Sequence, residues 1–275
     1  MSTIRIAVAS TPLTATLQEA LPAAISAVEE AGRLGARIVC LPETGLPGHR
    51  SQVRAVPDVP LDALEGALRD VAAAASRARV VTIVGAEWPT QDGRQIVSVV
   101  IDADGTTLGR QVKTQIDPSE EADYVPGTGR HVFTAGGLRF GIAICHEAFR
   151  YPEITRGLVL AGAQVVFVPH YVTTVDGTLP ARWCDAANPY NEKAIMCRAL
   201  ENTVYVAAAN VAGPDQGSVT GIIGPDGDLI ASLPYGEVGI VVADVDLDLA
   251  TRQLAVRWSP ERNGATVGRY EQGRA

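Results

Sequence analysis

Short apolar runs alternate along this 275-residue chain with segments in which apolar residues recur every three or four positions. The short runs predict buried β-strands, and the wider spacing predicts helices with one apolar face. We expect strands at residues 4–10, 37–41, 80–85, 96–101, 106–113, 132–134, 138–145, 164–169, 204–209, 220–223, 229–232 and 239–245. We expect helices at residues 16–34, 61–77, 152–161, 189–202 and 249–256. The first of these should begin near Pro22, because proline suits the first turn of a helix.

The expected elements come in two similar passes, each of strands alternating with helices and then hairpins. Asp104-Gly105 and Asp226-Gly227 are typical of tight hairpin turns and occupy matching places in the two passes. This order predicts an α/β fold of four layers, αββα, with two sheets face to face and helices outside. No linker or change of composition divides the chain. We therefore expect one domain over residues 1–275, with residues 258–275 as a C-terminal tail.

Reactive side chains stand at the ends of several expected strands. Cys145 ends the apolar run at residues 138–145, Glu43 follows the strand at residues 37–41, and Lys113 ends a hairpin strand. In α/β sheets, ligands bind at the carboxyl ends of strands. A cysteine becomes a good nucleophile when a base takes its proton or a cation stabilises its thiolate. Glu43 and Lys113 are candidates for these two roles, although each of the three side chains alone has an ordinary structural explanation.

Three segments around these residues resemble the signature segments of the nitrilase superfamily, the carbon–nitrogen hydrolases. They are Leu41-Pro42-Glu43, Gly109-Arg110-Gln111-Val112-Lys113 and Gly141-Ile142-Ala143-Ile144-Cys145. Further landmarks follow in the same order: Arg150-Tyr151-Pro152-Glu153, Gly162-Ala163, Arg198-Ala199-Leu200-Glu201-Asn202 and Ala209-Asn210. The resemblance implies the αββα sandwich of the nitrilase-like type, commonly paired into a dimer.

The same resemblance implies a catalytic set. Glu43 would be the general base and acid, Lys113 would stabilise the oxyanion, and Cys145 would be the nucleophile. Glu121 matches the spacing of an accessory glutamate, and the adjacent Glu120 is the alternative. The implied activity is that of an amidase, which hydrolyses a small carboxamide or N-carbamoyl compound to acid and ammonia through a cysteine thioester.

Other functions stay open from the sequence. A nitrilase is the alternative within the family, because Glu147, two places after the cysteine, resembles nitrilases more than amidases. A non-catalytic binding protein and a papain-like Cys–His hydrolase are rivals from other classes. We expect His146, Glu147, Phe149 and Tyr171 to line the substrate pocket. No metal or other cofactor is expected, since His146, Glu147 and His170 lack a usual ligand spacing.

Composition restricts the partners. The net charge of −8 argues against nucleic acid or an anionic membrane surface. No apolar run approaches the roughly 18–20 residues of a spanning helix, and the first residues resemble a strand rather than a signal peptide. The four cysteines lack paired spacing, which favours reduced thiols in the cytoplasm. We expect a small-molecule amide or nitrile as substrate. We also expect a homodimer or higher homo-oligomer, formed through residues 189–202 and the tail after Trp258.

Overall fold

Two six-stranded sheets form the centre of the molecule in the computed structural model, which describes residues 3–50 and 55–263. The first sheet has the order β12-β1-β2-β3-β4-β5, and the second has the order β6-β7-β8-β9-β10-β11. The strands of the first sheet are β1 (Thr3–Ser10), β2 (Ile38–Cys40), β3 (Val81–Thr90), β4 (Gly93–Ile101), β5 (Thr107–Val112) and β12 (Gly239–Asp246). Those of the second are β6 (Val132–Ala135), β7 (Leu138–Ile142), β8 (Val165–Pro169), β9 (Tyr205–Ala209), β10 (Gly221–Ile223) and β11 (Leu229–Ser232).

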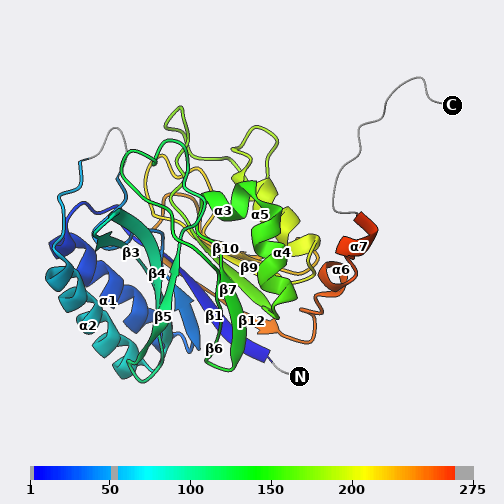
Figure 1. The fold of residues 1–275 in the computed structure, drawn as a ribbon, viewed down its shortest axis with the longest axis horizontal. Helices are drawn as coiled ribbons and strands as arrows, with labels where there is room; N and C mark the ends of the chain where they lie inside the picture. The colour runs from blue at the N-terminus through cyan, green and yellow to red at the C-terminus, as the bar shows by residue number, and fades with distance from the viewer. Residues whose placement is uncertain (1–2, 51–54, 264–275) are drawn as a thin grey trace.

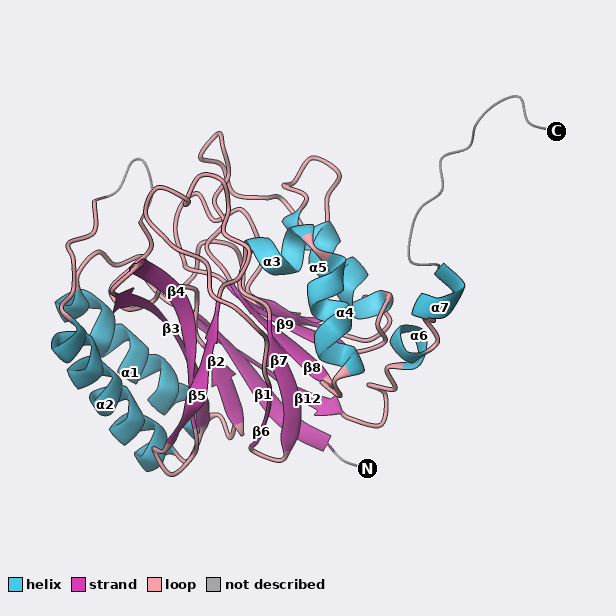
Figure 2. Ribbon diagram, in the orientation of Figure 1, coloured by secondary structure: helices cyan, strands magenta, loops and turns pink. Residues whose placement is uncertain are grey.

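Helices cover the outer face of each sheet (Figures 1 and 2). The first sheet packs against α1 (Leu17–Arg33) and α2 (Leu61–Ala78), and the second against α4 (Pro152–Leu160) and α5 (Asn191–Leu200). One apolar cluster fills the space between the sheets, and another fills the layer between the first sheet and its helices. The αββα sandwich expected from the sequence is confirmed.

The two sheets have the same internal pattern of strand directions. Each starts with an antiparallel pair, continues with two parallel pairs, and ends with two antiparallel pairs. The turns at Asp104-Gly105 and Asp226-Gly227 join the last two strands of their respective sheets. The repeat inferred from element order is therefore present in the strand topology.

Some element boundaries differ from the sequence prediction. The helix α1 begins five residues before Pro22, because Thr16 and Glu19 form a reciprocal capping box that fixes the first turn. Strands β3 and β4 extend to a tight turn at Gln91-Asp92, so their hairpin is longer than predicted. The predicted helix at residues 249–256 is reduced to α6 (Gln253–Val256).

Two short helices were not predicted. The helix α3 (His146–Arg150) follows β7 directly after Cys145, and α7 (Pro260–Asn263) lies within the expected C-terminal tail. The rest of that tail, residues 264–275, lies outside the described residues. Within the described part of the chain, no helix is both long and apolar enough to cross a membrane.

The loops that carry the candidate residues gather at one end of the sandwich, above the carboxyl ends of the parallel strands (Figure 2). Glu43 follows β2, Lys113 follows β5, and Cys145 follows β7. Gly85 on β3 allows the segment that bears Glu43 to lie directly against the sheet. A Cβ atom at residue 85 would lie 2.2 Å from the Pro42 carbonyl oxygen, so only glycine fits there.

Candidate active site

A buried lysine lies between two buried carboxylates. Lys113 Nζ is 2.7 Å from Glu43 Oε1 and 2.7 Å from Glu120 Oε2, and the Lys113 side chain has no exposed surface. Because an ammonium group has three donors and no acceptor, both oxygens receive a hydrogen bond from it. The two carboxylates therefore fix the position of one positive charge within the site.

Further donors hold the two carboxylates. Glu43 Oε2 accepts from the backbone N–H of Tyr171 at 3.1 Å. Glu120 Oε2 also accepts from the Asp117 N–H at 3.2 Å, and Glu120 Oε1 lies 2.9 Å from His49 Nε2. Each of the four carboxylate oxygens therefore has at least one partner, which restricts the rotation of both side chains.

Cys145 stands on a strained turn between β7 and α3. Its φ of 50° and ψ of −112° are unusual for a residue other than glycine. Such a conformation costs about 1–3 kcal/mol and persists only where the surroundings enforce it. The Cys145 N–H donates to the Pro169 carbonyl oxygen, and Sγ lies 3.8 Å from the Tyr171 carbonyl oxygen. A sharp strand-to-helix turn of this kind projects a side chain beyond the edge of the sheet.

Charges around the thiol set its protonation. Burial raises the pKa of Cys145 well above its usual range, the Glu43 and Glu120 carboxylates raise it further, and Lys113 opposes them. Burial by itself would lower the pKa of Lys113, but Glu43, Cys145 and Glu120 together raise it, so the side chain stays an ammonium. At neutral pH the resting thiol therefore keeps its proton, and a base is needed to remove it.

The carboxylate against Lys113 is Glu120 and not the predicted Glu121. Glu120 is buried, whereas Glu121 is exposed. Burial raises the pKa of Glu120, but the hydrogen bond from His49 and the charge of Lys113 outweigh it and lower the pKa to about 2. The sequence spacing could not separate two adjacent glutamates, because the chain turns sharply at residues 118–123 and directs only one of them inward.

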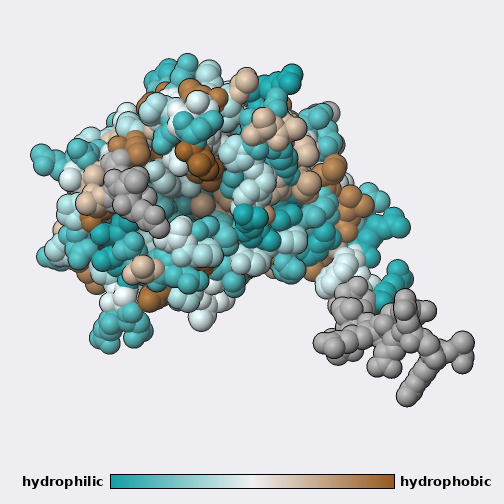
Figure 3. Space-filling view, turned by 90° about the horizontal axis from the view of Figure 1, so that it is seen from above, coloured by the Kyte–Doolittle hydropathy of each residue, from teal (hydrophilic) through white to brown (hydrophobic). Residues whose placement is uncertain are grey.

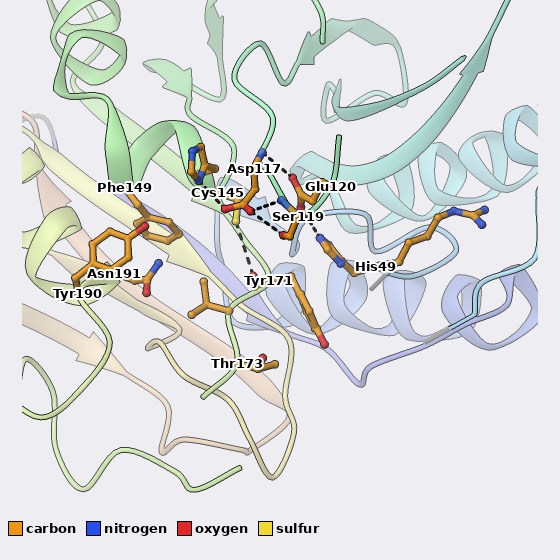
Figure 4. A pocket seen from close by; sticks show the side chains of 13 residues that line it. His49, Asp117, Ser119, Glu120, Cys145, Phe149, Tyr171, Thr173, Tyr190 and Asn191 are labelled. Carbon is orange, nitrogen blue, oxygen red and sulfur yellow. Dashed lines mark hydrogen bonds and ion pairs between the residues drawn. The ribbon is translucent and has the colours of Figure 1, made fainter. Parts of the chain in front are cut away.

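A cavity of about 390 Å³ opens beside Cys145. Figure 3 looks down on this end of the molecule and shows a hollow with hydrophobic side chains beside it. In Figure 4, His49 and Glu120 lie on one side of the cavity, and Phe149, Tyr190 and Asn191 lie on the other. The lining residues are His49, Arg50, Asp117, Ser119, Glu120, Cys145, His146, Phe149, Tyr171, Val172, Thr173, Tyr190 and Asn191.

Three of the four predicted pocket residues line this cavity: His146, Phe149 and Tyr171. His146 Nδ1 lies 2.7 Å from Asp117 Oδ2, so a carboxylate holds its ring. This pairing gives the imidazole a partner other than the neighbouring thiol, which weakens the Cys–His alternative.

Glu147 was predicted to contact substrate, and its place in the structure is different. It is completely buried, and it accepts from Thr114 N (2.5 Å) and Thr114 Oγ1 (2.7 Å) and from Ile144 N (3.0 Å). Arg130 Nη2 donates to it at 2.6 Å. Glu147 therefore joins the chain after Lys113 to the turn before Cys145, and its role is to hold these two segments together.

Two arginines support the site, and neither was assigned a role from the sequence. Arg130 supplies the counter-charge of Glu147, although it lies in a segment without periodicity. Arg198 on α5 is buried, and it donates to the carbonyl oxygens of Ala148 (2.9 Å) and Phe149 (3.1 Å). These carbonyls belong to α3, so Arg198 fixes the helix that begins just after Cys145.

Glu43, His49 and Glu120 also form a group whose ligand atoms lie within 4.8 Å of one another, close enough for a metal ion. The ammonium of Lys113 already contacts both carboxylates at 2.7 Å. A divalent cation between them would have to displace that ammonium. The donor set therefore fits an ion pair with lysine better than it fits a metal.

Comparison with known proteins agrees with this geometry. The chain is 28% identical over 229 residues to a nitrilase of Pyrococcus abyssi, with 81% of each chain covered. It is 27% identical over 267 residues to an omega-amidase of Bos taurus, with 90% of each covered. A mutant of the amidase from Nesterenkonia sp. AN1, in which acrylamide has added to the active-site cysteine, matches with a TM-score of 0.76 and 25% identity, covering 94% of this chain and 99% of that one. The model of the carbon–nitrogen hydrolase family matches residues 5–253, and the chain therefore belongs to that family.

Proposed function

We propose that this carbon–nitrogen hydrolase is an amidase that converts a small carboxamide or N-carbamoyl compound to an acid and ammonia. The observation that carries the proposal is the buried Lys113 ammonium held between Glu43 and Glu120, beside Cys145 at the base of a cavity. The omega-amidase and the Nesterenkonia amidase support this reading over a nitrilase. The volume of the cavity suits a small substrate.

Acylation begins with proton transfer from the Cys145 thiol to Glu43 as Sγ attacks the amide carbon. The raised pKa of the thiol makes this base necessary, since little thiolate is present at rest. The negative charge that develops on the amide oxygen meets the Lys113 ammonium and the backbone N–H of His146, which opens α3. Preorganised donors of this kind contribute about 3–4 kcal/mol each.

Collapse of the tetrahedral intermediate releases ammonia. Glu43 returns the proton to the departing nitrogen, and the acyl group remains on Cys145 as a thioester. Water then attacks the thioester carbon while Glu43 takes its proton. The acid leaves, and the Cys145 thiolate recovers a proton from Glu43, so the side chain begins the next cycle as a thiol.

Glu120 takes the accessory role in this scheme. It shares the Lys113 ammonium with Glu43, and its low pKa keeps it ionised throughout the cycle. A permanently charged partner holds the ammonium in place while Glu43 gains and loses its proton. Glu120→Gln should therefore reduce kcat although the side chain takes no proton itself.

An ammonia-release screen over small amides, ureido acids and nitriles tests the proposal, with Cys145→Ala as the blank. The expected result is release from at least one amide, and full loss of that activity in the variant. Full activity in Cys145→Ala would contradict the mechanism. Release from nitriles but not from the matched amides would instead identify a nitrilase, the alternative within the family.

Acrylamide labelling supplies a second test, because acrylamide adds to the active-site cysteine of a mutant of the Nesterenkonia amidase. Cys145 should react in preference to the half-buried Cys184, because Glu43 can take the proton of Cys145 and the Lys113 ammonium favours its thiolate. Equal labelling of the two, together with no turnover of any amide, would favour a binding protein that keeps the fold. Acylation that survives replacement of each of His49, His131, His146 and His170 would exclude a Cys–His hydrolase.

We also propose that the chain acts as a homodimer or higher homo-oligomer. Leu160, Leu200, Leu254, Val256 and Trp258 on or beside α4, α5 and α6 are all between 43% and 55% exposed. Large apolar side chains gathered on one face are typical of an interface. Monomeric behaviour of the full chain in light scattering would contradict this proposal.

Two further proposals concern organisation and location. We treat residues 1–275 as one domain, because one apolar cluster draws on both sheets. We place the protein in the cytoplasm, because all four cysteines are free thiols. Limited proteolysis that yields two stable halves would contradict the first, and recovery from a secreted fraction would contradict the second.

A further inference from the structure

His49 contacts the catalytic carboxylates although nothing in the mechanism above assigns it a role. It lies in the loop after β2, six residues beyond Glu43, and only 6% of it is exposed. Its Nε2 atom is 2.9 Å from Glu120 Oε1 and 3.8 Å from Glu43 Oε2. Since an ionised Glu120 can only accept, the imidazole must be the donor through an Nε2–H.

The ring of His49 makes a second contact that reaches the other carboxylate. It stacks on the ring of Tyr171, with centroids 4.3 Å apart and planes inclined by 18°. The Tyr171 N–H donates to Glu43 Oε2 at 3.1 Å. One imidazole thus supports Glu120 by a hydrogen bond and supports Glu43 through the residue on which it stacks.

Both carboxylates that His49 supports contact Lys113. The ammonium depends on Glu43 and Glu120 for its position, because each carboxylate contacts it at 2.7 Å. Loss of the donor to Glu120 Oε1 would leave one oxygen of a buried carboxylate without its partner. The carboxylate would then rotate or take up a proton, and either change releases one side of the lysine.

We propose that His49 is a positioning residue, which donates to Glu120 and packs against Tyr171 so that Lys113 stays aligned with the oxyanion. The inference rests on the amidase function proposed above. It extends that function, since it assigns a role to a histidine that lines the cavity and acts through Glu120 and Tyr171.

The hydrogen bond from His49 to Glu120 should affect how kcat/KM depends on pH. Glu120 faces Lys113, Glu43, Cys145, His49, and both the N–H and the carboxylate of Asp117. The hydrogen bond from His49 is the largest of the effects that lower the pKa of Glu120. Without that donor the pKa of Glu120 rises, so Glu120 takes up a proton at a higher pH. The acid limb of kcat/KM then moves to higher pH as well.

Two substitutions separate the two contacts. His49→Phe keeps a flat ring to stack on Tyr171 but has no donor, whereas His49→Gln has a donor at the place of Nε2 but no ring. We expect His49→Phe to lower kcat about 10- to 100-fold, as loss of a charge-assisted hydrogen bond would, with KM changed less than about threefold. We expect His49→Gln to recover most of kcat and the wild-type acid limb. His131→Gln is the control, because His131 is exposed and stands outside the cavity.

The experiment measures kcat and KM from pH 4 to 9 on the best amide from the screen. A kcat and an acid limb in His49→Phe equal to those of the wild type would overturn the inference, as would a loss confined to KM. If His49→Phe does not fold, His49→Leu replaces it, since leucine is smaller and equally unable to donate. An inactive wild type would instead refute the amidase function, so the two failures are distinguishable.

Discussion

Replacing Glu147 by glutamine should lower both the stability of the fold and kcat, although Glu147 does not contact the substrate. Glutamine keeps one oxygen, which can still accept from Thr114 N and Oγ1. Its amide nitrogen would face Ile144 N–H and Arg130 Nη1. Both of these groups are donors, so neither would find an acceptor at that position. The turn before Cys145 and the strand end at Lys113 lose the carboxylate that joins them.

The magnitude follows from burial. Glu147 has no exposed surface and Arg130 has 18%, so the variant leaves a largely buried guanidinium without its counter-charge. Breaking a buried pair on one side costs about 3–5 kcal/mol, and the partial exposure of Arg130 favours the lower end. With an unfolding entropy of about 2.1 cal/mol/K per residue, about 3 kcal/mol lowers the Tm of a chain of this length by about 5 °C.

Calorimetry and steady-state kinetics on Glu147→Gln test both effects together. We expect the lower Tm to accompany a fall in kcat, because Lys113 and Cys145 are no longer held at a fixed separation. Glu121→Gln is the matched control, since Glu121 is an exposed glutamate and should tolerate the change. A Glu147→Gln variant with the wild-type Tm and a raised KM would refute this reasoning, and would restore the substrate contact predicted from the sequence.

Three more changes test other parts of the structure. Gly85→Ala should lower kcat about 100-fold in steady-state assays, because its Cβ would displace the backbone beside Glu43. Arg198→Met should cost about 1–3 kcal/mol in urea unfolding and reduce kcat, since two carbonyls of α3 lose their donor. Burial lowers the pKa of His170 to about 4, so the unfolded chain binds the extra proton between pH 6.5 and 4 and stability falls as the pH falls. The loss amounts to about 3 kcal/mol, and unfolding curves of His170→Asn should lack it.

The sequence predicted the sandwich because buried strands and amphipathic helices produce different spacings of apolar residues. It also predicted that the two sheets share one topology, because the hairpin turns at Asp104-Gly105 and Asp226-Gly227 occupy matching places in the two halves of the chain. Short helices were harder to predict from the sequence. The helix α3 has only five residues, too few for a periodic pattern, and its position depends on contacts from Arg198 far along the chain.

Some residues of the candidate site could likewise be predicted from the sequence, and others could not. Glu43, Lys113 and Cys145 could be named because each follows an apolar strand and stands in a segment that resembles a signature of the nitrilase superfamily. Glu120 could not be separated from Glu121, because the direction of each side chain depends on a turn in an irregular loop. His49 carried no local signal at all. Its contact with Glu120 joins residues 71 positions apart, and only the folded chain brings them together.

The two sheets contribute different members of the candidate set, so the site exists only where the sheets meet. Glu43 and Lys113 follow strands of the first sheet, and Cys145 follows a strand of the second. The hydrogen bonds that cross between the two halves include those from Tyr171 N–H to Glu43 and from Thr114 N–H to Glu147. A relative shift of the sheets would stretch both contacts at once. Because one close-packed apolar cluster fixes the sheets against each other, activity should persist up to the cooperative loss of that cluster and disappear with it.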